Sequence, residues 1–216
     1  NKDQLGLSQS ASSGALTITG AATSGQVEIA VNGGTAVDIG AVSGSGLATQ
    51  YKAAVDAVAG VSSTVGSTVT QALGVAQFTQ GAATTSTYQL EILVDGVAED
   101  IVASQTATIS AADINTAFST YATGKAGITV AGDSAAGTLV MTDTQGRDIS
   151  FRATMTAGGD TGAGGAVTYN SSAVANDGTE TTKSFGTLTI TSDDGSAFAF
   201  SGTDESKIGA SNNQSV

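Results

Sequence analysis

Alternating apolar and polar positions predict two β-hairpins, one early in the chain and one near its middle. Residues 27–31 and 88–94 place apolar side chains at every second position, the period of a half-buried strand. A turn signal follows each run, Asn32-Gly33-Gly34 in the first and Asp95-Gly96 in the second. Returning strands are expected through Val37 and Ile39 and through residues 97–101.

One amphipathic helix is expected after each hairpin. In the first copy a single apolar stripe contains Leu47, Tyr51, Val55 and Val58, and Gly60 is placed to end the helix. In the second copy the stripe contains Ile114, Phe118 and Tyr121. Ser110 and Asp113 have the spacing of a capping box at its start, and Gly124-Lys125 marks its expected end.

A third repeated piece defines the repeat unit. Residues Gly137–Phe151 read GTLVMTDTQGRDISF, and residues Gly186–Phe200 read GTLTITSDDGSAFAF. Without gaps the two share several identical positions, and Met141 and Ile149 correspond to Ile190 and Phe198. Each is interpreted as a strand, a polar glycine turn and a second strand that form a hairpin. The repeat unit is therefore a hairpin, a helix and a hairpin.

The order of these pieces suggests that one unit is inserted in the other. The second unit is contiguous, but the first lacks a closing hairpin until residues 186–200. The predicted fold is α+β, with two small, mainly antiparallel β domains that each carry one helix. A base domain would comprise residues 1–82 and 155–216, with residues 83–154 as an inserted tip domain. Two serial units, at 1–80 and 85–200, are the alternative. The structure of 61–77 is left open, and 170–184 is expected to be a loop.

Composition excludes several classes of function. The chain has 216 residues, a formal net charge of −12 and a pI near 4.1, so it lacks the basic surface that nucleic acid or anionic lipid requires. No apolar run approaches the ~20 residues of a membrane-spanning helix. The chain has no His and no Cys, which excludes cysteine nucleophiles, Ser–His triads and the usual zinc sites. We therefore predict a non-enzyme, with no catalytic, cofactor-binding or metal-binding residues and no cofactor.

The acidic and glycine-rich motifs of the chain are interpreted as structural. Glu99 and Asp100 are adjacent on a strand, so their side chains point to opposite faces. The segments 143–148 and 193–195 have turn composition and lack the spacing of an EF-hand calcium loop. Gly158–Gly165 is interpreted as a linker, because no Gly-Lys-Ser or Gly-Lys-Thr follows it.

Three further features have ordinary interpretations. The five lysines stand in scattered polar stretches, and none shares a recognisable motif with a serine. Asn170 and Asn213 begin formal N-glycosylation sequons, interpreted as chance matches. The aromatic residues are assigned to core packing; they are Tyr88, Phe118, Tyr121, Phe151, Phe185, Phe198 and Phe200.

The repeat resembles the flagellin internal repeat found in the variable outer domains of bacterial flagellins and in some hook-associated proteins. The resemblance rests on the Val94-Asp95-Gly96 hairpin, the helix SAADINTAFSTYAT and the GTL-type segments, and residues 86–152 match best. The stretch 186–210 also looks like the end of a flagellin variable region. The long polymerising helices of that family have no counterpart in the short polar segments at residues 1–10 and 206–216.

The resemblance implies a secreted, extracellular structural domain of a flagellin in the bacterial flagellum, which serves motility. Its partners would be other flagellin subunits of the filament, reached through terminal helices absent from these 216 residues. No nucleic-acid or membrane partner is expected, and exposed Ser and Thr are candidates for O-linked glycans. A hook-associated junction or cap protein and a bacterial surface adhesin domain are the alternatives.

Overall fold

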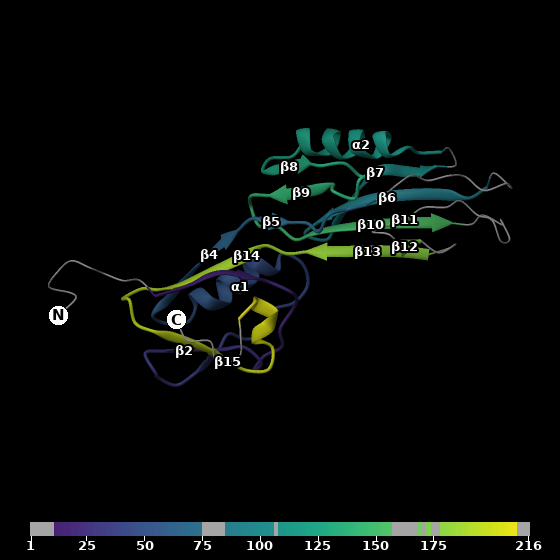
Figure 1. The fold of residues 1–216 in the computed structure, drawn as a ribbon. Coiled ribbons are helices and arrows are strands. Elements are labelled where there is room, and N and C mark those ends of the chain that lie inside the picture. Colours follow the sequence, from purple (N-terminus) through teal and green to yellow (C-terminus); the bar gives the residue numbers. More distant parts are fainter. Residues whose placement is uncertain are drawn as a thin grey trace. The chain divides into compact units, whose positions relative to one another are not determined.

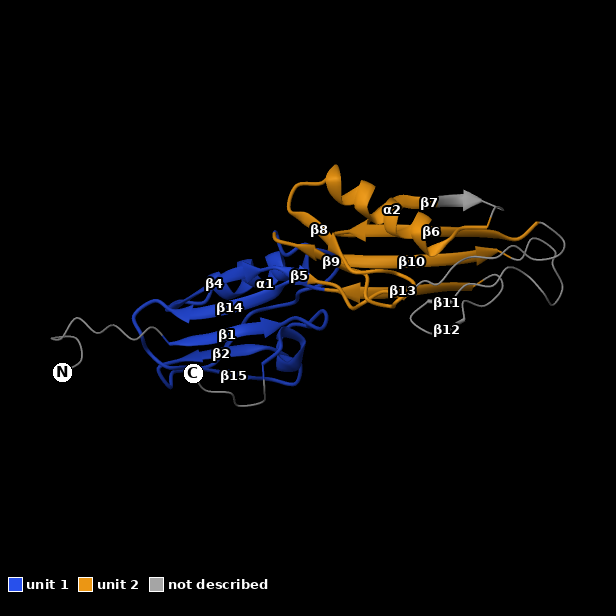
Figure 2. Cartoon of the chain, turned by 45° about the horizontal axis from the view of Figure 1, so that its top comes forward, with its two compact units in different colours: residues 1–68, 145–147, 185–216 blue, residues 69–144, 148–184 orange. Residues whose placement is uncertain are grey.

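The chain folds into two compact units, which Figure 2 distinguishes by colour. The structure is a computed structural model that describes residues 11–74, 85–105, 108–156, 168–169, 172–173 and 178–210. Unit 1 comprises residues 1–68, 145–147 and 185–216, and unit 2 comprises residues 69–144 and 148–184. Unit 2 therefore interrupts unit 1 along the chain.

The described residues of unit 1 form two three-stranded antiparallel sheets and one α-helix (Figure 1). The first sheet has the order β1 (Ser12–Thr17), β14 (Thr187–Ser192) and β4 (Val61–Gly66). The second has the order β15 (Phe198–Ser201), β2 (Glu28–Val31) and β3 (Val37–Asp38). Helix α1 (Leu47–Asp56) and the 3-10 helix η2 (Glu205–Ile208) contribute buried side chains to the core of this unit.

Unit 2 has a four-stranded antiparallel sheet with the order β13 (Gly178–Ser184), β10 (Ile149–Thr156), β6 (Thr87–Val94) and β7 (Val97–Gln105). A three-stranded sheet has the order β5 (Thr68–Val69), β9 (Val140–Asp143) and β8 (Ile128–Ala131), with β5 beginning at the last residue of the first segment of unit 1. The remaining elements are α2 (Ala111–Thr123) and the short pair β11 (Thr168–Tyr169) and β12 (Ser172–Ala173). The α+β class predicted from the sequence is confirmed.

The two units repeat one strand-pairing pattern. The hairpin β2–β3 corresponds to β6–β7, and α1 corresponds to α2. Strand β4 pairs with β14 as β8 pairs with β9, and β15 pairs with β2 as β10 pairs with β6. The register agrees residue by residue: Phe200 lies opposite Ile29 in unit 1, and Phe151 lies opposite Ile92 in unit 2.

Individual backbone hydrogen bonds recur at the same positions of the repeat. The Asp193 amide donates to the Gly60 carbonyl at 3.0 Å, and the Thr144 amide donates to the Gly127 carbonyl at 2.9 Å. Both glycines have left-handed φ angles, 89° and 82°, which an L side chain rarely adopts. Glycine is therefore required at the point where each unit passes from its helix to the next strand.

Equivalent apolar positions form the core of each unit. The matched buried pairs, unit 1 first, are Leu47 and Ile114, Tyr51 and Phe118, Val61 and Ile128, Leu188 and Leu139, Ile190 and Met141, Phe198 and Ile149, and Phe200 and Phe151. Most of these pairs differ in side-chain shape, but both members of every pair are buried. Each unit therefore has its own hydrophobic core.

The two helices begin in different ways. The predicted capping box of α2 is confirmed: the Ser110 Oγ accepts the Asp113 amide at 3.2 Å, and the Asp113 carboxylate accepts the Ser110 amide at 2.9 Å. Helix α1 instead begins after Gly46, which has a φ of 70° and no side-chain cap. Helix α1 ends at Asp56, so Val58 lies beyond it, buried in the following turn.

Two predictions from the sequence were wrong. The GTL-type segments are not hairpins, because β9 and β10 lie in different sheets, as do β14 and β15. The chain passes from one sheet to the other between the two strands, and each strand finds a partner elsewhere in its unit. The expected loop at 170–184 contains β13 at Gly178–Ser184, which pairs with β10 along its whole length. Its polar residues lie on an edge strand, where one face and one edge need no apolar side chains.

The structure also assigns the segment left open and divides the chain at different points. Strands β4 and β5 account for residues 61–66 and 68–69. Residues 69–74 and 178–184, expected in the base domain, belong to unit 2. Residues 145–147, expected in the tip domain, belong to unit 1. The sequence pattern does not indicate these exchanges, because they depend on strand pairing between distant segments.

Unit 1 should fold without unit 2. Gly66 and Thr187 are the last directly paired residues of β4 and β14, so Asn-Gly in place of residues 67–186 would join them as a two-residue hairpin. We expect a shortened chain that unfolds cooperatively with heat. Its midpoint should be lowered, because two contributions to unit 1 are also removed: Phe185, which packs against the core, and Gly146, which lies against Val65 and Gly66. Circular dichroism during heating tests this, and a gradual, non-cooperative loss of signal would contradict it.

Candidate functional site

The adjacent carboxylates of β7 do not form an acid–base pair. Glu99 forms an ion pair with Lys125, at the end of α2. Asp100 instead accepts a hydrogen bond from the Gln89 side-chain amide at 2.7 Å. The two neighbours of β7 therefore have different partners, as their alternation on a strand predicts.

The acidic turns are held by backbone and hydroxyl hydrogen bonds. Asp194 accepts the Ser196 amide at 2.8 Å and the Ser192 hydroxyl at 3.0 Å, and these bonds, with that of Ser196 foremost, lower the pKa of its carboxyl. At the corresponding bend of unit 2, the Asp148 amide donates to Asp95 at 2.9 Å. Among the described residues, no group of three or more Asp or Glu side chains is placed to hold a metal ion. Gly158–Gly165 and the sequons at Asn170 and Asn213 lie outside the described residues.

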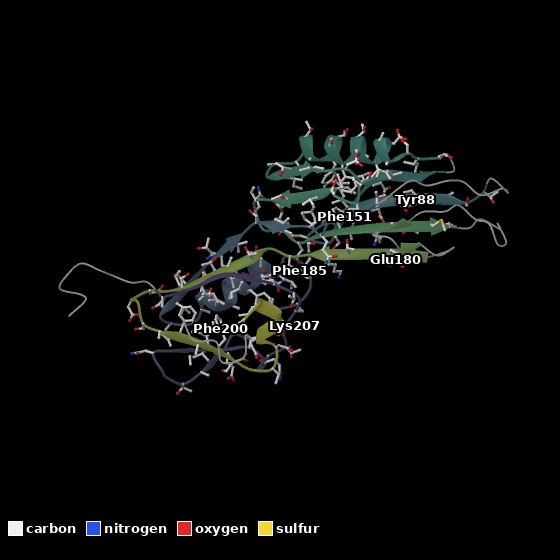
Figure 3. All side chains as sticks on the ribbon, viewed as in Figure 1. Tyr88, Phe151, Glu180, Phe185, Phe200 and Lys207 are labelled. Atoms are coloured by element: carbon white, nitrogen blue, oxygen red, sulfur yellow. The ribbon has the colours of Figure 1, made fainter. Side chains whose placement is uncertain are left out.

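The aromatic side chains pack in the two cores. Phe151, labelled in Figure 3, meets Phe118 of α2 edge to face, with ring centroids 5.3 Å apart. Phe200 meets Phe198 in the same manner at 5.7 Å in unit 1. Tyr88 is also fully buried, whereas Tyr121 and Phe185 are partly buried against the cores. The assignment of these residues to core packing is confirmed.

A polar network on the outer face of the four-stranded sheet was not found from the sequence. Arg152 of β10 donates to both carboxylate oxygens of Glu91 on β6, at 2.5 and 2.7 Å. The Glu91 side chain is only 9% exposed. The hydrogen bond from Arg152 lowers the pKa of the Glu91 carboxyl, although burial acts in the opposite direction. Arg152 and Glu91 are directly opposite across the two strands, so cross-strand register would have revealed the pair.

Unit 1 has a different set of side chains at the same three positions. Glu28 lies opposite Asp38 just as Glu91 lies opposite Asp100. The third strand contributes Ser201 in place of Arg152, and its hydroxyl donates to Glu28 at 3.1 Å. Two carboxylates thus face each other across strands β2 and β3 without an arginine at the third position, an arrangement that weakens strand pairing.

A second network ties α1 to β4 in unit 1. Asp56 accepts the Ser63 amide at 2.7 Å and the Ser63 hydroxyl at 2.8 Å, and it forms an ion pair with Lys52. Lys52 also donates to the Ser63 carbonyl at 3.0 Å. Burial raises the pKa of Asp56, but the hydrogen bonds from Lys52 and Ser63 outweigh it, so this pKa is lowered overall. These bonds anchor the end of α1 to β4.

The described side-chain networks thus hold strands and helices together. Comparison with known proteins does not assign a function to any of these residues. No protein-family model matches the chain, and no curated protein matches it. In the described part of the chain, no helix combines the length and apolar character needed to span a membrane.

Transferring the arginine of unit 2 to unit 1 should stabilise unit 1. In a Ser201→Arg variant the new guanidinium would lie beside Glu28, as Arg152 lies beside Glu91, so we expect a gain of about 0.5 kcal/mol in the free energy of unfolding. Urea unfolding measures this, with the same substitution in a Glu28→Gln background as the matched control. An equal gain in both backgrounds would show that the carboxylate is not the cause.

The Glu91–Arg152 pair should contribute to acid sensitivity. Because folding lowers the pKa of Glu91 from its ordinary 4.5, its stabilisation is present above that value and is lost as the pH falls through the lower folded value. A Glu91→Gln variant should therefore lose less stability than the parent chain between about pH 5 and pH 2. Urea unfolding across this range tests it, with exposed Glu180→Gln as the control. Parallel curves for the parent and the Glu91→Gln variant would contradict the prediction.

Proposed function

We propose that this chain is a non-catalytic structural module: the solvent-facing outer domain of a flagellar filament subunit. The nested repeat supports the proposal most directly. Two units with the same strand pairing are arranged so that one interrupts the other, and each has its own core. The choice of a flagellar filament subunit rests on the resemblance of the sequence to the flagellin internal repeat.

The placement of the chain ends in the fold suits a module carried by a larger protein. Ala11 packs partly buried against the core of unit 1, and Ala210 is buried in that same core. The described chain therefore enters and leaves through unit 1. This arrangement suits a domain inserted into a longer chain, because both connections can then come from one body.

The mechanism of such a module is physical. It adds folded mass beyond the polymerising part of the subunit and presents an acidic surface, with a net charge of −12. Like charges on neighbouring copies would oppose lateral bundling of filaments, and salt would limit this repulsion to a Debye length of about 8 Å.

Deleting the 216-residue segment from its parent gene tests the proposal. We expect cells that still assemble full-length filaments, seen by electron microscopy, because the polymerising contacts lie outside this module. Cells that express the shortened subunit but lack or shed their filaments would contradict it and favour a junction or cap protein. Binding of a glycan or host protein by the isolated 216 residues would favour an adhesin domain.

A further inference from the structure

The turn between β2 and β3 contains the only Asn-Gly pair in the sequence. Asn32 and Gly33 have left-handed φ angles of 52° and 67°, and the Gly34 amide donates to the Val31 carbonyl at 2.9 Å. These values define a type I′ turn, for which Asn-Gly is a preferred pair. Asn followed by Gly is also a chemically labile sequence, because glycine places no side chain near the asparagine amide.

The surroundings of Gly33 leave space around its Cα. A Cβ built on Gly33 would have nothing within 4 Å, so this side of the turn is open. Asn32 and Gly33 are both exposed. The two residues that would react are therefore exposed, and atoms from the rest of the fold do not crowd the Gly33 Cα.

The corresponding turn of unit 2 is held more firmly. Asp95 and Gly96 have φ angles of 49° and 80°, and Val94 pairs directly with Val97 beside them. The strands on either side, β6 and β7, have eight and nine residues. After Asn32-Gly33, by contrast, the chain runs through residues 34–36 before it reaches β3, which has two residues. The β2–β3 turn is therefore the less restrained of two otherwise equivalent turns.

We propose that Asn32 is a site of spontaneous deamidation in this protein. The Gly33 nitrogen attacks the Asn32 side-chain carbonyl carbon; the new C–N bond closes a succinimide, the bond to the amide NH₂ breaks, and ammonia leaves with the Gly33 proton. Water then opens the ring at either carbonyl, which gives aspartate or isoaspartate and adds one carboxylate.

The repeat indicates how the fold accommodates each product. Aspartate already occupies the equivalent position at Asp95, where its carboxylate accepts the Asp148 amide, so the aspartate product suits this turn. Isoaspartate lengthens the backbone by one carbon next to the bond from the Asn32 amide to the Ala197 carbonyl, now 2.7 Å long. The isoaspartate product is therefore expected to disturb the pairing of β2 with β15.

Ageing the purified chain at neutral pH tests the proposal. Trypsin cuts after Lys52 and so separates Asn32 from residue 95, and mass spectrometry of the peptides locates any exchange of an amide for an acid. We expect the mass shift in the peptide that contains Asn32, with two products resolved by chromatography. Asn115 is an internal control, because its side chain is held by Asp133 at 2.9 Å and by the Ser134 amide at 2.9 Å.

An Asp95→Asn variant provides the matched control. It places a second Asn-Gly pair in the tighter turn, and its side-chain oxygen can still accept the Asp148 amide. In the folded variant, position 32 should convert faster than position 95, and in urea the two should convert at similar rates. The proposal is overturned if Asn32 stays intact in the folded chain while the unfolded chain converts, or if position 95 converts as fast as position 32 in the folded variant.

Discussion

Antiparallel pairing between strands far apart in the sequence holds each unit together. Strand β15 pairs with β2, and β10 pairs with β6, in matching registers. This pairing places Phe198 and Phe200, or Ile149 and Phe151, in the two cores. Unit 2 is nearly contiguous, whereas unit 1 receives β14 and β15 only after unit 2 has been passed. Closing the long loop between β2 and β15 costs more conformational entropy than closing the shorter one between β6 and β10. The stability of unit 1 therefore depends on the burial of Phe198 and Phe200.

The repeat keeps its backbone frame while it exchanges the polar contacts placed on it. Unit 1 anchors its helix to β4 through Lys52, Asp56 and Ser63. In unit 2 the equivalent positions hold Ser119, Thr123 and Val130: the Thr123 hydroxyl donates to its own helix at the Ser119 carbonyl, and Val130 packs against the core. Helix–strand attachment is thus polar in one unit and apolar in the other. On the outer faces of the sheets the difference is reversed. Unit 2 has the ion pair between Arg152 and Glu91, and unit 1 has Ser201 in place of the arginine. The hydrogen-bonded frame and the buried apolar positions, rather than any one polar contact, define this fold.

Local signals in the sequence predicted the local structure well. Ser110 and Asp113 identified the start of α2, and the alternation at residues 88–94 identified β6, because these features depend on neighbours a few residues away. The apolar identities in the GTL-type segments predicted the core positions but not the sheets to which the strands belong. Strand β13 was not predicted, because an edge strand of Thr, Glu and Lys has no alternation of apolar and polar residues. Arg152 and Glu91 are distant in sequence, so their pairing could be inferred only once the β10–β6 register was known.

The acidic character of the chain is partly explained by this architecture. Tight bends leave backbone amides without strand partners, and carboxylates accept them: Asp38 accepts the Gly40 amide, Asp133 the Ala135 amide and Asp194 the Ser196 amide. These bonds lower the pKa of Asp38 and of Asp194, so both remain charged to a lower pH than a free side chain. The same residues that close the turns therefore add to the negative charge of the surface. A fold built from short strands and many bends becomes acidic in part for structural reasons, and the repulsion proposed between copies would need no separate set of residues to produce it.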